Sequence, residues 1–274
     1  MQLQFNIYGF SIGMAIIIGC ALIERQMKKE AVDTYLSEFF YEIGILVFVF
    51  GVIGARIWHV FTDFFMYRHN LISMFFIWNG GLSILGGVMG GIIGILISVF
   101  VLSEVRLLPP KVKKEHIFKL LDVSVFGLPV GQAIGRWGNY FNQELYGKPT
   151  SGFFKIFIDA EHRLLSYENT AYYHPLFLYE VIATGLFALV LHIAYRSKKL
   201  KRKLPQIGSG NLFLLYIFYY SLIRFFLDFL RIDTAIRYGI FGINQLVLLI
   251  VIFLILIYFL SNYLRIIARY VFKK

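Results

Sequence analysis

The chain of 274 residues is 58% hydrophobic, with a mean hydropathy of +0.70 and a formal net charge of +11. This composition excludes an ordinary soluble domain and indicates an integral membrane protein. The basic residues gather in short segments between apolar runs, as the positive-inside rule predicts for cytoplasmic loops, so we expect no nucleic-acid partner. The single cysteine, Cys20, excludes an internal disulfide and a thiolate metal cage.

The apolar runs predict an all-α protein, with about seven transmembrane helices in one polytopic membrane domain covering residues 1–274. Each crossing needs about 20 apolar residues. The basic segments all fall on one side if the N-terminus is outside and the C-terminus is cytoplasmic. The first run has no basic n-region and no small-residue cleavage site, so we expect it to stay uncleaved. The predicted spans lie near residues 5–24, 39–62, 82–103, 117–137, 175–195, 210–230 and 242–263.

Three features mark the first three spans. Tyr8 lies near the outer end of the first, where an aromatic-belt position is the alternative to a functional one. Arg56 lies in the second span and can pair with a carboxylate. Ile77–Gly91 reads IWNGGLSILGGVMGG. Its glycine pair Gly86 and Gly87 suits close approach of a lipid or of another helix, and the residues alone leave both open.

The most polar stretch is Gly131–Gly147, which reads GQAIGRWGNYFNQELYG and follows an apolar helical run. Arg136, Asn139, Asn142 and Glu144 stand where the hydrophobic signal ends. Charged groups near hydrocarbon are costly and usually mark a functional site. The alternative is a glycine-lined helix interface with a snorkelling arginine.

Residues 139–174 form the longest non-spanning segment and predict a small extracytoplasmic cap. Within it, Gly152–Asp159 has the alternating, aromatic character of a strand. The fifth span then begins with HPLFLYE, which places His174 at the outer boundary and Glu180 nearly two turns deeper. A boundary histidine is either an interfacial cap or a group that handles protons.

The sixth span carries Tyr220, Arg224, Asp228 and Arg231 at helical spacing on one face. Counting about 1.5 Å per residue from the cytoplasmic end of each helix, Arg136 and Arg224 reach similar depths, at about 25 Å and about 21 Å. Two guanidiniums at one depth make a phosphate-sized positive site. For Asp228 and Arg231, an internal salt-bridge ladder is the alternative.

These motifs resemble the prolipoprotein diacylglyceryl transferase family, and the resemblance covers nearly the whole chain. Residues 135–147 are similar to G-R-x-G-N-x-x-N-x-E-x-x-G, and residues 220–231 to the family's Y-x-x-x-R-F-x-x-[acid]-x-x-R. Three positions depart from the pattern. Phe177 replaces the glutamine of H-P-x-Q-L-Y-E, Asp228 replaces the more usual glutamate, and Leu85 stands where relatives have histidine or sometimes tyrosine in W-x-G-G-x-S-x-H-G-G.

The resemblance implies a bacterial inner-membrane enzyme with its active site facing the outer leaflet. It would transfer the diacylglyceryl group of phosphatidylglycerol to the lipobox cysteine thiol in the signal peptide of a prolipoprotein, releasing glycerol 1-phosphate. Because Leu85 removes a candidate base, a non-catalytic lipid-binding paralogue and a transferase with another donor or acceptor are the alternatives. No metal or cofactor motif is present. Asp122 also matches the family pattern, but its position near the cytoplasmic entry of its helix indicates a structural role, as a cap or a helix-pairing group.

The expected catalytic residues are Arg136, Arg224, Tyr8, Tyr220 and His174. The expected substrate-binding residues are Arg136, Asn139, Asn142, Glu144, Gly147, Gly86, Gly87, Asp228, Arg231, Glu180 and Arg56.

Overall fold

The computed structural model describes residues 7–30, 32, 34–77, 80–104, 114–232 and 237–271. Helix coincides with each of the seven predicted spans. Trp78 and Asn79 of the glycine-rich segment, and residues 105–113 of one basic segment, lie outside the described residues. The long helices are α1 (Ile7–Lys29), α3 (Phe40–Thr62), α5 (Ile84–Glu104), α7 (Leu128–Phe141), α8 (Leu176–Arg196), α10 (Asn211–Leu227) and α11 (Ile243–Val271).

Short elements connect the long helices. They are α2 (Thr34–Glu38), α4 (Phe64–Tyr67), α6 (Lys114–Ser124), α9 (Lys198–Lys201) and the 3-10 turns η1 (Leu71–Phe75), η3 (Ala160–His162) and η4 (Leu165–Tyr167). Two small antiparallel sheets pair β1 (Ile156–Phe157) with β2 (Tyr172–Tyr173) and β3 (Arg237–Tyr238) with β4 (Phe241–Gly242).

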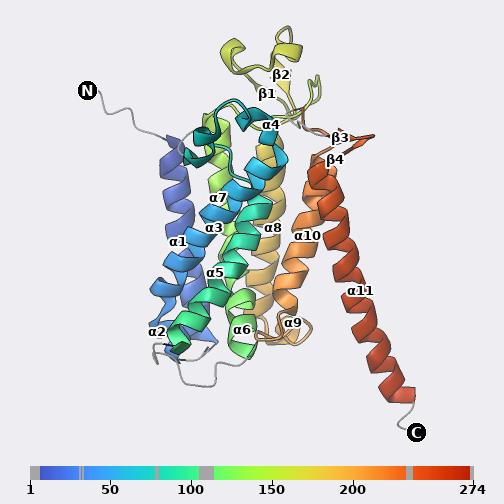
Figure 1. The fold of residues 1–274 in the computed structure, drawn as a ribbon. Helices are drawn as coiled ribbons and strands as arrows, with labels where there is room; N and C mark the ends of the chain where they lie inside the picture. The colour runs from blue at the N-terminus through green and yellow to red at the C-terminus, as the bar shows by residue number, and fades with distance from the viewer. Residues whose placement is uncertain are drawn as a thin grey trace.

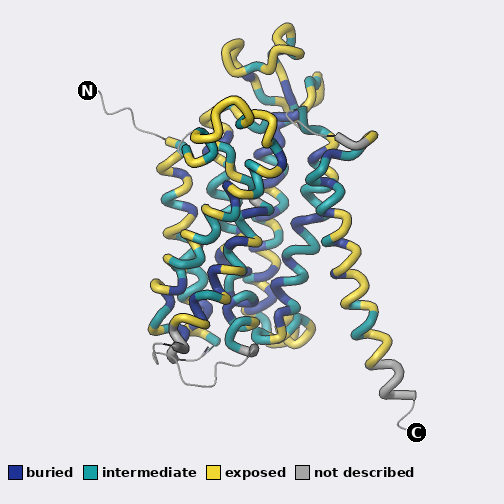
Figure 2. The backbone as a smooth tube through the Cα atoms, viewed as in Figure 1, coloured by how far each residue is buried: buried dark blue, intermediate teal, exposed yellow. Residues whose placement is uncertain are grey.

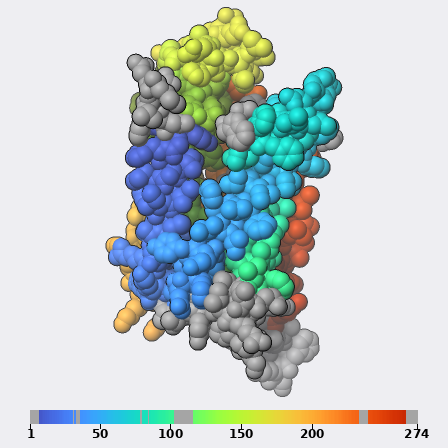
Figure 3. Space-filling view, turned by 60° about the vertical axis from the view of Figure 1, so that its left-hand side comes forward, coloured from blue at the N-terminus to red at the C-terminus, as the bar shows by residue number. Residues whose placement is uncertain are grey.

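The long helices form a bundle in which α1 packs on α7, α7 on α8, α3 on α5, and α10 on α11. The segment with β1 and β2 stands at one end of the bundle, and α6 and α9 lie at the other end (Figure 1). α11 slants away from the other helices toward its C-terminal end. The space-filling view shows an opening between α1 and the outer half of α3 (Figure 3).

Exposed residues gather on the outward sides of the helices, whereas buried residues line their inward sides (Figure 2). Many of the exposed residues are large and apolar, and Ile17, Ile57 and Phe61 are 65%, 65% and 68% exposed. A soluble domain does not present such a continuous apolar surface to water. Lipid is therefore the solvent that this surface fits.

Four helices of the described part are long and apolar enough to cross a membrane, namely α1, α3, α8 and the Ile243–Arg265 part of α11. The bent pair of α6 and α7 makes five if it forms one span, and the apolar parts of α5 and α10 are shorter. An all-α integral membrane protein with four or five candidate spans is thus established.

The fourth predicted span, 117–137, is not one straight helix. α6 ends at Ser124, α7 begins at Leu128, and the two helices meet at 44°. Pro129 stands in the first turn of α7, where a missing N–H is tolerated but a continuing helix would clash with the ring. The bend also lies against α1, because a Cβ added to Gly127 would sit 2.2 Å from the Gly19 carbonyl oxygen. Pro129 indicates this break in the sequence, whereas the hydropathy of the run does not.

Asp122 fixes the inner end of this broken span to α10. Its carboxylate accepts hydrogen bonds from the backbone N–H groups of Gly208, Gly210 and Phe213, at 2.9, 2.8 and 3.0 Å. A carboxylate at a helix N-terminus satisfies donors that have no partner within the helix. The interpretation of Asp122 as a structural cap is confirmed.

The α3–α5 contact depends on glycines that let the two backbones touch. A Cβ on Gly86 would lie 2.2 Å from the Gly54 carbonyl oxygen, and one on Gly90 would lie 2.1 Å from the Phe50 carbonyl oxygen. Gly87 is less tight, with Ala55 Cβ at 3.8 Å. Of the two alternatives that the residues left open for Gly86, the structure shows the helix contact.

We expect Gly90→Ala to lower the stability of the protein by about 1–3 kcal/mol, because the added methyl meets backbone that cannot rotate away. Gly44→Ala on α3 is the matched control, since its Cβ would meet nothing within 4 Å. Thermal unfolding of both variants in the same detergent measures the difference. Equal midpoints for the two variants would show that the contact tolerates a side chain.

The segment 139–174 folds on a small core of its own after the last turn of α7. Tyr146, Ile158 and Tyr173 are buried together, and the Tyr146 hydroxyl donates to the His162 carbonyl at 2.8 Å. The strand expected over Gly152–Asp159 is mostly absent. Only Ile156 and Phe157 pair with β2, and residues 152–155 before them are exposed.

Candidate active site

Glu180 is the centre of a buried polar cluster between α7, α8 and α10. Its side chain is 3% exposed, its Oε2 lies 2.7 Å from Arg136 Nη2, and its Oε1 pairs with Arg224 Nη1. The Tyr220 hydroxyl donates to the same Oε2 at 3.4 Å. Two guanidiniums from different helices therefore share one carboxylate. The contact confirms that the two guanidiniums lie at one level of the bundle, as the helical rise predicted.

Asp228 extends the cluster along α10. Its Oδ1 lies 3.0 Å from Arg224 Nη2 and 3.5 Å from Arg231 Nη1, and its side chain is 2% exposed. We call the row Arg136–Glu180–Arg224–Asp228–Arg231 the arginine ladder. The internal ladder that was the alternative for Asp228 and Arg231 is thus present, and it continues into the two arginines expected to bind phosphate.

Arg136 and Arg224 keep N–H donors that the described residues do not use. In a buried setting, a charged donor is costly unless it meets an acceptor or an anion. A guanidinium has five N–H donors. Among the described residues, the polar partners of Arg136 number three and those of Arg224 number two. Because their side chains are 18% and 11% exposed, donors remain that an anion can reach.

Asn139 links the arginine ladder to the start of the cap. Its Oδ1 accepts from Arg136 Nη1 at 3.2 Å, and its Nδ2 donates to Glu144 Oε1 at 2.8 Å. Asn139 is buried, whereas Glu144 is exposed. Asn142 is the exposed C-cap of α7, and its backbone N–H bonds the Gly138 and Tyr140 carbonyls. The carboxamide of Asn139, and not that of Asn142, therefore orients Arg136.

Two of the expected proton-handling tyrosines lie beside Arg136. The Tyr220 hydroxyl accepts from Arg136 Nη2 at 3.4 Å. The Tyr8 ring packs on α7 at Gly138, where an added Cβ would lie 2.7 Å from Tyr8 Cδ2. The charged groups that act on the Tyr8 hydroxyl are Glu144 and Arg136. Gly138 is therefore the position that lets α1 bring Tyr8 to the arginine.

Gly147 and His174 form a crossing of the chain at the cap end of the bundle. The Gly147 N–H donates to the His174 carbonyl at 2.9 Å, and Gly147 forms an isolated bridge with Arg231. A Cβ there would lie 3.0 Å from both His174 Cβ and the Leu230 carbonyl oxygen. The His174 Nδ1 lies 3.0 Å from the Tyr179 hydroxyl. Within the described part of the chain, the His174 imidazole bonds Tyr179 and no residue of the arginine ladder.

Contrary to the expectation, Arg56 pairs with no carboxylate of the described residues. Its guanidinium donates to four backbone carbonyls of the connector between α3 and α5, those of Ser73, Met74, Gly80 and Gly81, at 2.6–3.1 Å. Arg56 is 7% exposed. The carbonyl cage satisfies the buried charge, so this arginine organises the connector.

Replacing Arg56 by glutamine should loosen residues 71–77 without unfolding the bundle, because one amide cannot serve four separated carbonyl groups. Hydrogen exchange of the peptides covering 71–77 should be faster, while that of α8 should stay as it is in the native protein. Unchanged exchange in 71–77 would mean that other contacts hold the connector.

The two departures from the family pattern on α5 and α8 have different surroundings. Phe177 is buried, and its ring lies 5.7 Å from that of Trp137 and 5.2 Å from that of Tyr140. Leu85 shares a face of α5 with Val88 and Ile92 by helical spacing. These two residues pack against the core that contains Tyr216 and Tyr220. Leu85 therefore lies on the side of α5 that faces this core.

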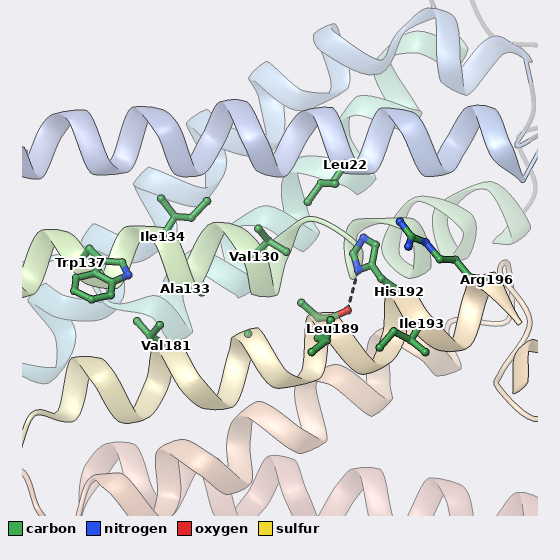
Figure 4. A pocket seen from close by; sticks show the side chains of 12 residues that line it. Leu22, Val130, Ala133, Ile134, Trp137, Val181, Leu189, His192, Ile193 and Arg196 are labelled. Atoms are coloured by element: carbon green, nitrogen blue, oxygen red, sulfur yellow. Dashed lines mark hydrogen bonds between the residues drawn. The ribbon is translucent and has the colours of Figure 1, made fainter. Parts of the chain in front are cut away.

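A groove of about 500 Å³ opens between α1, α7 and α8 (Figure 4). Its lining is apolar except at the inner end, where His192 bonds the Ala188 carbonyl at 2.8 Å and Arg196 stands nearby. Trp137 lines the other end, as Figure 4 shows. No residue of the arginine ladder lines the groove. In the described part of the chain, no cluster of histidine, cysteine and acidic side chains could hold a metal ion.

Comparison with known proteins agrees with the motifs. The family model described as prolipoprotein diacylglyceryl transferase matches residues 1–261. A phosphatidylglycerol–prolipoprotein diacylglyceryl transferase of Clostridium botulinum (strain Langeland) is 35% identical over 272 residues, which cover 98% of this chain and 96% of that protein. Proteins of the same name from Thermosynechococcus vestitus and Trichormus variabilis are 34% and 33% identical over 246 and 228 residues. These cover 89% and 83% of this chain, and 84% and 75% of the relatives.

Proposed function

The chain belongs to the prolipoprotein diacylglyceryl transferase family, and we propose that it transfers the diacylglyceryl group of phosphatidylglycerol to the lipobox cysteine thiol of prolipoproteins. The observation that carries the proposal is the arginine ladder, in which Arg136 and Arg224 meet on one buried carboxylate and keep donors for an anion. A phosphodiester is the anion that such a pair of guanidiniums fits best.

In the reaction, a thiolate attacks the glycerol carbon that carries the phosphodiester oxygen. A sulfur–carbon bond forms, the carbon–oxygen bond breaks, and its electron pair leaves on the phosphate of glycerol 1-phosphate. The negative charge of the phosphate rises from one to two during this step. Arg136 and Arg224 stabilise the added charge, and they do so more strongly than in water because the site is largely buried.

The neighbouring groups position this clamp. Asn139 holds Arg136 by its side-chain oxygen and is itself held by Glu144. Glu180 sets the spacing of the two guanidiniums, and Asp228 orients Arg224 from the other side. Tyr8 and Tyr220 lie close enough to Arg136 to bond the substrate phosphate or its glycerol.

The membrane arrangement belongs to the same proposal. Seven spans, with α6 and α7 forming one broken crossing, place the N-terminus outside and the C-terminus in the cytoplasm. The basic segments then lie on the cytoplasmic side. The arginine ladder and the cap 139–174 face the outer leaflet of the bacterial inner membrane, where a signal peptide can present its cysteine.

Mass spectrometry of a lipobox peptide incubated with the purified protein in phosphatidylglycerol vesicles tests the proposal. A diacylglyceryl mass shift with the native protein, absent with Arg136→Ala, is the expected result. Phosphatidylglycerol binding without any mass shift would instead support the lipid-binding paralogue for which Leu85 argues. A shift only with another anionic phospholipid would indicate a transferase with a different donor.

A further inference from the structure

We propose that His59, oriented by Asp63, takes the thiol proton in this chain and supplies the imidazole that Leu85 does not. The inference rests on the proposed transfer reaction. It concerns a group that neither the motifs nor the family pattern singles out.

His59 and Asp63 form an oriented imidazole–carboxylate pair at the outer end of α3. The His59 Nδ1 lies 3.2 Å from Asp63 Oδ2, and the Thr62 hydroxyl donates to the same Oδ2 at 2.7 Å. A carboxylate bonded to Nδ1 places the proton of a neutral imidazole there and leaves the lone pair on Nε2. Among the described residues, Nε2 has no hydrogen-bond partner. The ring is thus set up as a base with its accepting nitrogen unused.

The surroundings leave the pair reachable. The two side chains are 22% and 21% exposed. The charged groups that face the imidazole are Arg56 on α3 and Asp63, the residue that follows α3. The Tyr67 ring of α4 meets the imidazole edge-on at 5.9 Å. From the connector, Gly81 packs directly on the ring, since a Cβ there would lie 2.6 Å from Nε2. A larger residue at 81 would cover the accepting nitrogen.

The pair lies in the same part of the molecule as the missing histidine. Gly81 is four residues before Leu85, and the Ser83 N–H bonds the Ala55 carbonyl one turn before His59. Leu85 lies on the face of α5 that continues into Val88 and Ile92, which pack on the core with Tyr220. The C-terminal ends of α3, α7 and α10 all lie toward the cap end of the bundle (Figure 1). His59, Arg136 and Arg224 each stand within five residues of the C-terminal end of their own helix. The His59 imidazole therefore lies toward the cap end of the bundle, on α3, which packs against the helix α5 that carries Leu85.

In the proposed step, the thiol S–H bond breaks and its proton moves to Nε2. The resulting thiolate attacks the glycerol carbon, and the leaving phosphate takes the carbon–oxygen electron pair. The imidazolium then releases its proton to water or to the phosphate monoester. No oxidant or further reactant is needed.

The decisive experiment compares the pH dependence of transfer by the native protein with that of His59→Asn. Asparagine can still donate to Asp63 but has no lone pair where Nε2 was, so it keeps the structural bond and removes the base. At pH 7 we expect at least a tenfold slower transfer, in line with the usual contribution of a general base. The rate of His59→Asn should then rise with pH toward about 8.5, the ordinary pKa of a thiol, whereas the native rate should level off earlier.

Two further variants keep the test decisive. Asp63→Asn should slow transfer less than His59→Asn does, because it removes the carboxylate that orients the imidazole but keeps the imidazole itself. His69→Asn changes an exposed histidine that bonds only Arg68 in the described chain, and it should leave the rate unchanged. A His59→Asn protein with the native rate and pH profile would overturn the inference and would mean that the arginines alone generate thiolate. An inactive native protein would overturn the proposed function itself.

Discussion

Replacing Arg136 by lysine is expected to slow diacylglyceryl transfer by about 10²–10³-fold, the usual cost of losing one preorganised donor to a developing oxyanion. Lysine keeps the charge but cannot reach Asn139, Glu180 and a phosphate oxygen with separate N–H groups in one plane. The variant therefore separates bidentate geometry from charge. Steady-state transfer to a lipobox peptide at saturating phosphatidylglycerol measures the effect.

Arg25→Lys is the matched control for this substitution. Arg25 is exposed near the inner end of α1, far along the chain from any residue of the arginine ladder, and its replacement should leave the rate as it is. A native rate in Arg136→Lys would rule out the bidentate phosphate clamp, because a point charge would then be sufficient.

Glu180→Gln is expected to have the largest effect on stability, a loss of about 3–5 kcal/mol. The carboxylate is the shared acceptor of two buried guanidiniums, so the substitution leaves Arg136 with no carboxylate partner in the described chain and Arg224 with Asp228 alone. Burying like charges that meet no anion is far more costly than losing an ordinary hydrogen bond. Chemical unfolding in mixed micelles, with and without phosphatidylglycerol, measures the loss.

Glu144→Gln provides the comparison, because Glu144 is exposed and its one side-chain bond in the described chain is accepted from Asn139. Its stability should change by less than about 1 kcal/mol. Added phosphatidylglycerol should recover part of the stability of Glu180→Gln, since the lipid phosphate supplies an anion between the arginines. If Glu180→Gln were as stable as Glu144→Gln, the arginine ladder would not depend on its central carboxylate.

Much of the molecule was predictable from local features of the chain. Apolar runs of membrane-crossing length identify the helices, and each of the seven predicted spans is helical, although the bend before Pro129 divides the fourth. Counting helical rise also predicted that Arg136 and Arg224 lie at one level, and their shared carboxylate confirms it, although the break between α6 and α7 interrupts the helix along which Arg136 was counted.

Other features depend on which segments meet, and sequence does not contain that information. The four carbonyls around Arg56 come from a connector with no regular pattern, so a carboxylate partner was the wrong expectation. A glycine such as Gly86 looks the same in the sequence whether it lies against a lipid or against another helix. Only the packing of α3 on α5 shows that Gly86 lies against a helix.

The sequence by itself determined the membrane class, the helices, the family and the residues that carry charge in the outer half. The tertiary structure decided how those charges are paired. Glu180 became the centre of the site because α8 runs between α7 and α10, which brings one carboxylate within reach of arginines 88 positions apart in the chain (224 − 136). The physical reason is that the energy of a buried charge depends on distances to groups on other helices, and spacing along one helix cannot set those distances.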